Sequence, residues 1–446
     1  MHKFKQYWSN LRSSFWFVPS LLVVASIAFA IALIETDSFG GDRWLARWPR
    51  LFGAGADGAR QMLSTLAGSM MSVMGITFSM TLVALALASS QYTSRILRNF
   101  MGSRVTQVTL GIFAGIFAYC LVVLRTIRGG GGVDEFVPVL AVFFAFLLAL
   151  GGVGILVYFI HHIASSIQAS SIIASIAQDT IASVERLFPE RLGHGPDADE
   201  DEDQLLQSLN GKNWYVVPAA VNGYIQNVDN DALLRLARDR KTILRMERSI
   251  GTFVVQNTAL ASLALEEPPD QETIKALNSA YNIGRYRTVE QDPAFGIRQL
   301  VDMALKALSP GVNDTSTAVM CVDYLTAILA QLASRKFPSS QRYEGNDLRV
   351  IAIAPTFEGL LAEAFDQIRG SAMANVGIMA RMLSAIETLA SLTVSPRRRR
   401  ALHEQVLWIA ELAGRTTESA HERERLARRL KEVREVLQAE SASNDQ

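Results

Sequence analysis

A stretch of 34 residues without a charged side chain, 61–94, is the sequence feature that most constrains the fold. As one α-helix, this segment would be about 51 Å long at about 1.5 Å per residue. The hydrocarbon core of a bilayer is only about 30 Å thick, so such a helix must tilt, break or project beyond the membrane. We therefore expect this segment to cross a membrane and to extend past it.

Three further apolar runs predict three more membrane spans. They cover residues 15–34, 108–124 and 136–160. Polar residues from Glu35 onward follow the first run, with no small-residue cleavage site, so we predict a retained helix rather than a signal peptide. The sequence thus predicts a transmembrane domain over 1–163 with four helices, whose partner is the lipid bilayer.

The formal net charge of zero is the sum of two unlike parts, +6 over residues 1–163 and −6 over the remainder. Basic residues without acidic neighbours occupy the first 14 positions and the loop 95–107. By the positive-inside tendency, both termini are expected in the cytoplasm.

Two cysteines and a balanced charge exclude a disulfide framework and a strongly basic nucleic-acid binder.

Small and hydroxylated side chains form a stripe along the second span. The stripe consists of Ser64, Gly68, Ser72, Gly75 and Ser79. Steps of three and four residues place all five on one helix face. Two interpretations stay open: the stripe permits close helix packing, or several copies line a narrow, weakly polar path. Both hold if the stripe packs against its own copies around an axis.

Charged side chains are absent from the depth of every predicted span. Proton relays, ion-coupled transporters and voltage sensors depend on ionisable groups within the membrane. The functions that remain for the membrane helices are therefore passive conduction, lipid contact or anchoring. Arg95, Arg98 and Arg104 follow the second span, and we expect them to ring the cytoplasmic mouth of a path and to favour anions.

The rest of the chain is expected to form a cytoplasmic α+β region. Its predicted parts are a linking helix over 164–192, an acidic linker over 193–212, a small β-rich module over 213–268 and a mainly helical domain over 269–446. Alternating aspartates in 197–203 imitate the start of a calcium loop. However, Glu202 stands where glycine is needed and Ser208 where glutamate is needed, so we predict no metal site.

Several helix boundaries in this region have clear signals. Asp292 followed by Pro293 marks a helix start, and either Asn313 or Asp314 is expected to cap the next helix. The basic run 397–400 falls in the first turn of a helix, where the helix dipole disfavours it, so it suggests a partner: the acidic linker, a neighbouring subunit or anionic lipid.

Charged residues around these helix starts form a candidate cytoplasmic ligand site. The set is Arg285, Arg287, Asp292, Arg298, Asn313 and Asp314. Capping accounts for the acidic members, while the arginines suit an anionic ligand. The sequence contains no P-loop, GxGxxG, HExxH, GxSxG or CxxC, so we predict no catalytic residue and no cofactor.

The segment DPAFGIRQLVDMALKALSPGVND, residues 292–314, carries a family resemblance. Together with SSQYTSRILRNF, GYIQNVDNDAL and GTFVVQNTAL, it resembles the bacterial membrane-protein family catalogued as domain of unknown function 2254. The resemblance implies four N-terminal spans, a cytoplasmic C-terminal region and a location in the bacterial inner membrane. It transfers no chemistry to particular residues.

The leading functional hypothesis is a homo-oligomeric, channel-like protein of the bacterial inner membrane. Its passive, anion-favouring path would be lined by the second span, and its cytoplasmic domain would be regulatory. The alternative is a membrane-anchored sensory or scaffolding protein whose soluble domain binds a ligand or partner. A third hypothesis is an enzyme that uses the acidic residues around Asp292 and Asp314.

Overall fold

The computed structural model describes residues 16–38, 55–91, 104–128, 136–188, 211–373 and 375–442. The chain divides into two compact units, Met1–Ser171 and Ile172–Gln446.

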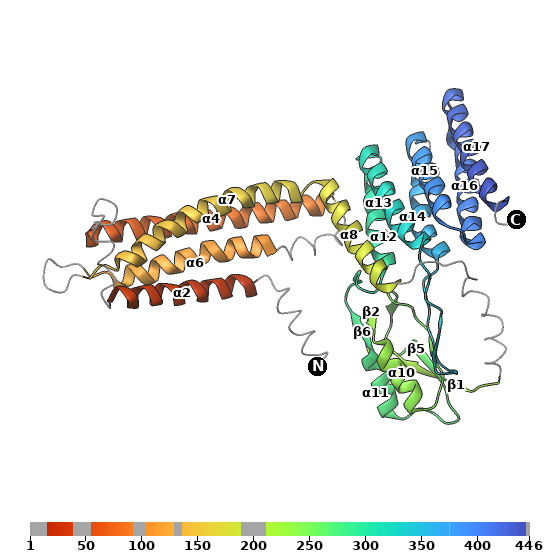
Figure 1. Ribbon diagram of the computed structural model, residues 1–446, viewed down its shortest axis with the longest axis horizontal. Coiled ribbons are helices and arrows are strands. Elements are labelled where there is room, and N and C mark those ends of the chain that lie inside the picture. Colours follow the sequence, from red (N-terminus) through yellow and green to blue (C-terminus); the bar gives the residue numbers. More distant parts are fainter. Residues whose placement is uncertain are drawn as a thin grey trace. The chain divides into compact units, whose positions relative to one another are not determined.

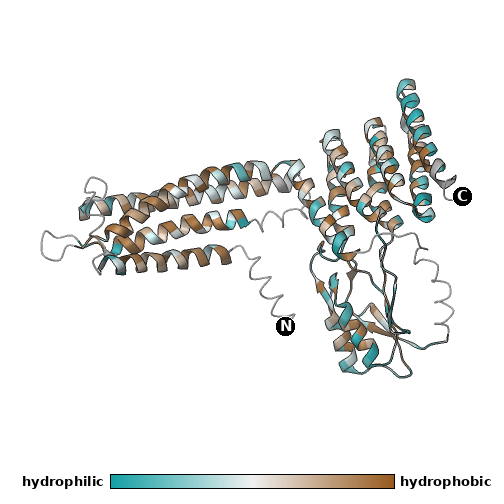
Figure 2. Ribbon diagram, in the orientation of Figure 1, coloured by the Kyte–Doolittle hydropathy of each residue, from teal (hydrophilic) through white to brown (hydrophobic). Residues whose placement is uncertain are grey.

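The first unit is built from four long helices. They are α2 (Phe17–Ser38), α4 (Ala56–Gln91), α6 (Arg104–Thr126) and α7 (Val139–Ser166), and the four predicted spans fall on them. Figure 2 shows apolar residues along all four. With 36 residues, α4 is one continuous helix of about 54 Å. Figure 1 shows α4 and α7 running side by side beyond one end of α2 and α6, as expected for a helix longer than the bilayer core.

Helix α6 packs against each of the other three helices of this bundle, most extensively against α2 and α4. Large side chains of α4 and α6, including Leu63, Phe113 and Tyr119, are fully buried in the interior. Gly111 and Gly115 of α6 form a small-xxx-small pair against α2. A Cβ atom on Gly111 would lie 2.6 Å from Leu22 Cδ1, so glycine is what allows α2 and α6 to approach closely.

Length and composition alone mark five helices as able to cross a membrane, among the residues described. Four are the helices of the first unit, and the fifth is α13 (Thr315–Ala333). The predicted number of four spans is therefore not confirmed by this criterion. Helix α13 belongs to the second unit, where α12, α14 and α15 pack against it.

The second unit begins with α8 (Ala169–Leu187) and continues into two small β-sheets. A turn at 167–168 separates α7 from α8, so the predicted linking helix over 164–192 is divided between two helices. The five-stranded sheet has the order β1 (Trp214–Pro218), β5 (Ala259–Ala264), β3 (Leu244–Met246), β8 (Asp347–Ile351) and β7 (Gln341–Glu344). The three-stranded sheet has the order β4 (Phe253–Val254), β2 (Gly223–Val228) and β6 (Tyr281–Gly284).

The β-rich part of the fold extends beyond the expected 213–268, because β6, β7 and β8 come from later in the chain. Residues 281–284 follow α11 (Gln271–Ala280) directly but pair antiparallel with β2, with Tyr281 opposite Val228. Strand β8 pairs parallel with β3. Helix α10 (Asn230–Asp239) and α11 pack together, and the apolar core of this region includes Leu233 and Leu277.

Three helical hairpins make up the C-terminal part. They are α12 (Pro293–Leu308) with α13, α14 (Phe357–Ala372) with α15 (Val376–Leu392), and α16 (Pro396–Thr416) with α17 (Ala420–Ala442). Contacts run α12–α14–α16 in one layer and α13–α15–α17 in the other (Figure 1). This is the stacking of helix pairs found in α-solenoids. Asp292 caps α12 and Asp314 caps α13, which confirms these two helix starts.

Candidate functional site

The small-residue stripe of α4 lies on the surface of the four-helix bundle. All five members, Ser64, Gly68, Ser72, Gly75 and Ser79, are exposed. A Cβ atom built on Gly68 or Gly75 would meet no atom within 4 Å. The opposite face of α4, from Ala59 to Met70, contributes buried residues to the core. Among the residues that the structure describes, the stripe is therefore not used for packing within the chain.

The hydroxyl groups of α4 have hydrogen-bond acceptors in their own helix. Ser72 donates to the carbonyl of Gly68 at 3.0 Å, and Ser69 donates to the carbonyl of Thr65 at 2.8 Å. Thr65 makes the same bond to Gln61 at 2.8 Å. A hydroxyl that bonds to the preceding turn needs no water, so Ser72 of the stripe suits contact with either lipid or a second protein surface.

The interior of the bundle is filled by packed side chains. Phe113, Ile116 and Tyr119 of α6 meet Leu63 of α4 there, and none of them is more than 3% exposed. A route across the membrane through the centre of one chain would have to displace this core. If the protein conducts, the path must instead follow an outer face such as the α4 stripe.

Only one of the three expected mouth residues falls within the described part of the chain. Arg104 is exposed and is the first residue of α6. Arg95 and Arg98 lie outside the described residues, as does the acidic run 197–203.

The first part of the candidate cytoplasmic ligand set is a buried ion pair. Arg287 Nε and Nη2 donate to Asp292 Oδ2 and Oδ1 at 2.8 and 3.1 Å. Asp292, which is 5% exposed, also accepts from the Phe295 N–H at 3.2 Å as the cap of α12. Burial raises the pKa of the Asp292 carboxyl, although Arg287 acts in the opposite direction. Both side chains therefore have structural partners.

The other members of the set lie elsewhere. Arg298 pairs with Asp302 at 3.0 Å and with Glu363 at 3.4 Å. Asp314 caps α13 by accepting from the Thr317 N–H at 3.1 Å. Asp292 and Asp314 flank the 16 residues of α12, which puts them about 24 Å apart.

Arg285 is exposed, and Asn313 adopts a left-handed conformation with φ of 48°. The structure thus does not gather the six residues into one pocket. Within the described ranges, no group of three or more His, Cys, Asp or Glu side chains is placed to hold a metal ion.

The basic run 397–400 is largely explained by contacts inside the chain. Arg398 is 5% exposed, and its Nη1 donates to the carbonyl groups of Leu332, Ala333 and Arg335 at 3.3, 3.1 and 3.1 Å. These carbonyls end α13, where a positive charge is favourable for the helix dipole. Arg397 pairs with Glu358 at 3.3 Å. An external partner is not needed to explain these two arginines.

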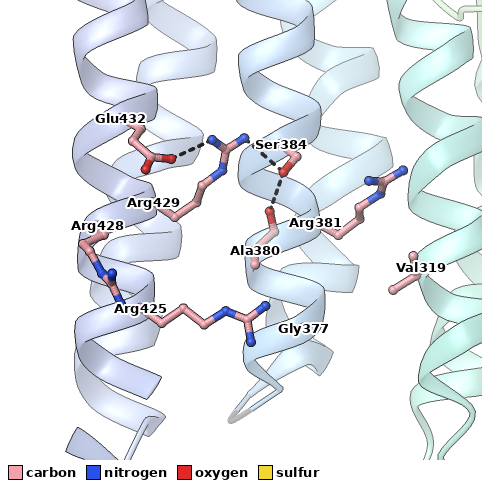
Figure 3. Close-up of a pocket in the computed structure, with 9 residues that line it drawn as sticks. All are labelled: Val319, Gly377, Ala380, Arg381, Ser384, Arg425, Arg428, Arg429 and Glu432. Atoms are coloured by element: carbon pink, nitrogen blue, oxygen red, sulfur yellow. Dashed lines mark hydrogen bonds and ion pairs between the residues drawn. The ribbon is translucent and has the colours of Figure 1, made fainter. Parts of the chain in front are cut away.

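A basic cleft that the sequence reasoning missed lies among α13, α15 and α17 (Figure 3). Its volume is about 600 Å³. We call it the Arg groove, and it is lined by Val319, Gly377, Ala380, Arg381, Ser384, Arg425, Arg428, Arg429 and Glu432. Its members on α15 and on α17 each follow the spacing i, i+3, i+4, i+7, which is the one signal the sequence carried.

The chain is similar to predicted membrane proteins and to uncharacterised mycobacterial proteins. The model of the family described as "Predicted membrane protein (DUF2254)" matches residues 12–388. Two relatives are each 32% identical to this chain over 368 residues, which is 80% of this chain and 68% of the relative. They are the "Uncharacterized protein Rv1290c" of Mycobacterium tuberculosis and the "Uncharacterized protein Mb1321c" of Mycobacterium bovis. No solved structure matches.

Proposed function

Because the chain belongs to the family of predicted membrane proteins with domain of unknown function 2254, a membrane location is the premise from which we propose its function. We propose that copies assemble in the bacterial inner membrane around an axis lined by α4, and form a passive, anion-favouring path. In this proposal α2, α4, α6 and α7 span the bilayer, both termini are cytoplasmic, and the second unit is regulatory.

The observation that carries the proposal is the outward direction of the α4 stripe. Close packing inside the chain is provided by Gly111 and Gly115 of α6, whose Cβ positions are crowded by α2. Gly68 and Gly75 of α4 have open space instead. A small-residue face with no neighbour among the described residues of its own chain is suited to meeting the same face of another copy.

A passive path agrees with the charge distribution of the bundle. The charged residues of its described helices lie near helix ends, for example Asp37 of α2, Arg60 of α4 and Arg104 of α6. Ion-coupled transport needs ionisable groups at depth. Arg104, at the end of α6 that we assign to the cytoplasm, would raise the local concentration of anions.

Helix α13 is excluded from the spans in this proposal because of its packing. Eight of its residues are buried in the helical stack, and its exposed Asp323 forms an ion pair with Arg381 of α15. A helix in these surroundings does not need lipid to cover its apolar face.

Conductance of the purified full chain in planar bilayers tests the proposal. We expect anion-favouring currents, and we expect Ser64→Leu to reduce them several-fold by filling the stripe. Ser69→Leu is the matched control, because Ser69 is also exposed on α4 but lies about 140° around the helix from Ser64. Silent bilayers with a demonstrably oligomeric protein would contradict the proposal.

The Arg groove and the stacked hairpins favour a second candidate function, a membrane-anchored sensory or scaffolding protein. Stacked helix pairs offer extended surfaces for ligands and partners. Removal of residues 1–163 separates the two functions. If the remaining fragment rescues the phenotype of a deletion strain, the membrane helices serve only as an anchor.

A further inference from the structure

We propose that the Arg groove binds a soluble phosphate-bearing molecule through Arg425 and Arg428. This inference concerns only the second unit, so it holds whether or not the protein conducts.

Two helix faces of opposite character form the walls of the groove. Helix α17 contributes Arg425, Arg428, Arg429 and Glu432, and α15 contributes mainly small residues. Since positions i, i+3, i+4 and i+7 share one helix face, each wall is a continuous stripe. Figure 3 shows Arg425 reaching from α17 toward α15 near Gly377.

The arginines of the groove differ in how their charge is compensated. Arg429 donates to Glu432 at 2.9 Å and to Ser384 at 3.1 Å, and it also pairs with Glu387. Arg381 pairs with Asp323. For Arg425 and Arg428, by contrast, no carboxylate of the described residues comes within the 4.0 Å of an ion pair.

Arg425 and Arg428 lie near further charges on α17. Arg425 has Arg428 at i+3 and Arg429 at i+4, while Arg428 also has Glu424 at i−4 and Glu432 at i+4. Like charges at these spacings repel and opposite charges attract, so the two effects offset each other along the helix. Three guanidinium groups at one wall of the groove nevertheless attract anions, and the two without a carboxylate in ion-pair range are the ones available to bind one.

The shape of the groove leaves space for that anion at one end. Gly377 and Ala380 stand where larger side chains of α15 would fill the cleft. Figure 3 places Arg429, Ser384 and Glu432 together at the other end, so the anion belongs beside Arg425 and Arg428. A volume of about 600 Å³ lies within the range of about 300–1,000 Å³ that is usual for small-molecule sites.

The chemistry of the lining favours phosphate. Guanidinium groups bind phosphate oxygens in pairs with fixed geometry, and two of them suit a group that offers several oxygens, such as a diphosphate. Val319 is the one larger apolar residue of the lining. A single larger apolar side chain does not form a channel for an acyl chain, so we favour a soluble ligand over a lipid headgroup.

Calorimetric titration with inorganic pyrophosphate tests the inference, with the full chain in nanodiscs of zwitterionic phosphatidylcholine. We expect saturable binding, and we expect Arg425→Gln with Arg428→Gln to weaken it at least tenfold. The control pair Arg400→Gln with Arg423→Gln removes the same charge from exposed positions of α16 and α17 outside the groove. This control should bind within twofold of the parent protein.

A thermal melt without ligand provides a second measurement. The groove variant should unfold within about 2 °C of the parent, because Arg425 and Arg428 are exposed. Pyrophosphate should stabilise the parent and the control pair but not the groove variant. The inference is overturned if the parent does not bind at millimolar pyrophosphate or if both double variants bind equally. If phosphate binding requires phosphatidylglycerol in the nanodisc, the groove binds a lipid headgroup, and the proposal of a soluble ligand is overturned.

Discussion

The carboxylate of Asp37 accepts a hydrogen bond at 3.2 Å from the backbone N–H of Ala141, which lies 104 positions later in the chain. The adjacent N–H of Leu140 donates to the same carboxylate at 3.3 Å. Pro138, which precedes α7, gives no side-chain cap of its own. The end of α2 therefore caps the start of α7, and Tyr119 of α6 adds a bond from its hydroxyl to the Ala141 carbonyl at 2.8 Å.

Loss of this cap should loosen the bundle. We expect Asp37→Ala to destabilise the protein by about 1–2 kcal/mol, as for other helix caps, because two N–H groups of α7 lose their acceptor. Glu35→Ala is the control, since Glu35 is exposed on the same helix. Thermal unfolding of the full chain in detergent measures both. Equal unfolding temperatures for the two variants would mean that Asp37 does not hold α7.

The second prediction concerns Arg398, whose guanidinium satisfies three carbonyl groups at the end of α13 and lies over Phe337 at 4.9 Å. Arg398→Ala removes these three hydrogen bonds, although the Leu332 carbonyl keeps the Arg335 N–H as a donor at 3.2 Å. We expect the free energy of unfolding to fall by about 3 kcal/mol. Arg398→Lys should rescue only part of it, because an ammonium group cannot reproduce the planar set of donors. Arg400→Ala, at an exposed position, should be nearly neutral. Chemical unfolding monitored by circular dichroism distinguishes the three variants.

Two glycines with positive φ allow backbone strain to be separated from steric conflict. Gly251 has φ of 83°, and a Cβ atom there would collide with the Asp292 carboxylate that pairs with Arg287. Gly345 has φ of 62° but open space around it. We expect Gly345→Ala to cost about 1 kcal/mol from strain alone. Gly251→Ala should lower the free energy of unfolding clearly more. A similar decrease for both variants would show that the Arg287–Asp292 pair can move aside at little energetic cost. Urea unfolding of both variants measures the difference.

Features that depend on residues close together in the sequence were predictable. The apolar length of α4 and the caps Asp292 and Asp314 follow from composition and helix-end chemistry within a few residues. Strand β6 was not predictable, because Tyr281 continues a helical pattern and becomes a strand only by pairing with Val228.

The same limit applied to the candidate sites. Arg398 looked unfavourable in the first turn of α16, since its partners are carbonyl groups more than 60 positions earlier. The Arg groove needs two stripes, one from α15 and one from α17, to meet where two helical hairpins stack. Each stripe alone is an ordinary solvated helix face. Chemistry that joins distant segments is therefore what sequence reasoning could not reach.

The cap of α13 should make stability depend on pH. Hydrogen bonds from the Thr317 side chain and backbone lower the pKa of Asp314 below its ordinary 3.8. A carboxyl whose pKa is lower in the folded state contributes stability above the unfolded pKa and loses it as the pH falls through the folded pKa.

We expect Asp314→Ala to cost about 1 kcal/mol near neutral pH, with the gap to the parent closing below pH 3.8. Denaturant unfolding across this range measures the gap. Asp314→Asn keeps a capping side chain that does not titrate. The difference in free energy of unfolding between this variant and the alanine variant should therefore be the same at every pH. A gap between parent and alanine variant that does not change with pH would contradict the assigned pKa direction.

Cysteine cross-linking tests whether the α4 stripe meets its copy. Cys120 and Cys321 are both buried, so a cysteine placed on α4 should be the reactive one. A disulfide requires Cα atoms about 4.4–6.8 Å apart. Small residues on facing helices allow that approach, so we expect Ser64→Cys to give disulfide-linked dimers upon oxidation in native membranes. Ser69 is exposed on the same helix but lies about 140° around it from Ser64, and we expect the Ser69→Cys variant to stay monomeric. Equal cross-linking at both positions would indicate random collision, and none at position 64 would place the stripe against lipid rather than against another copy.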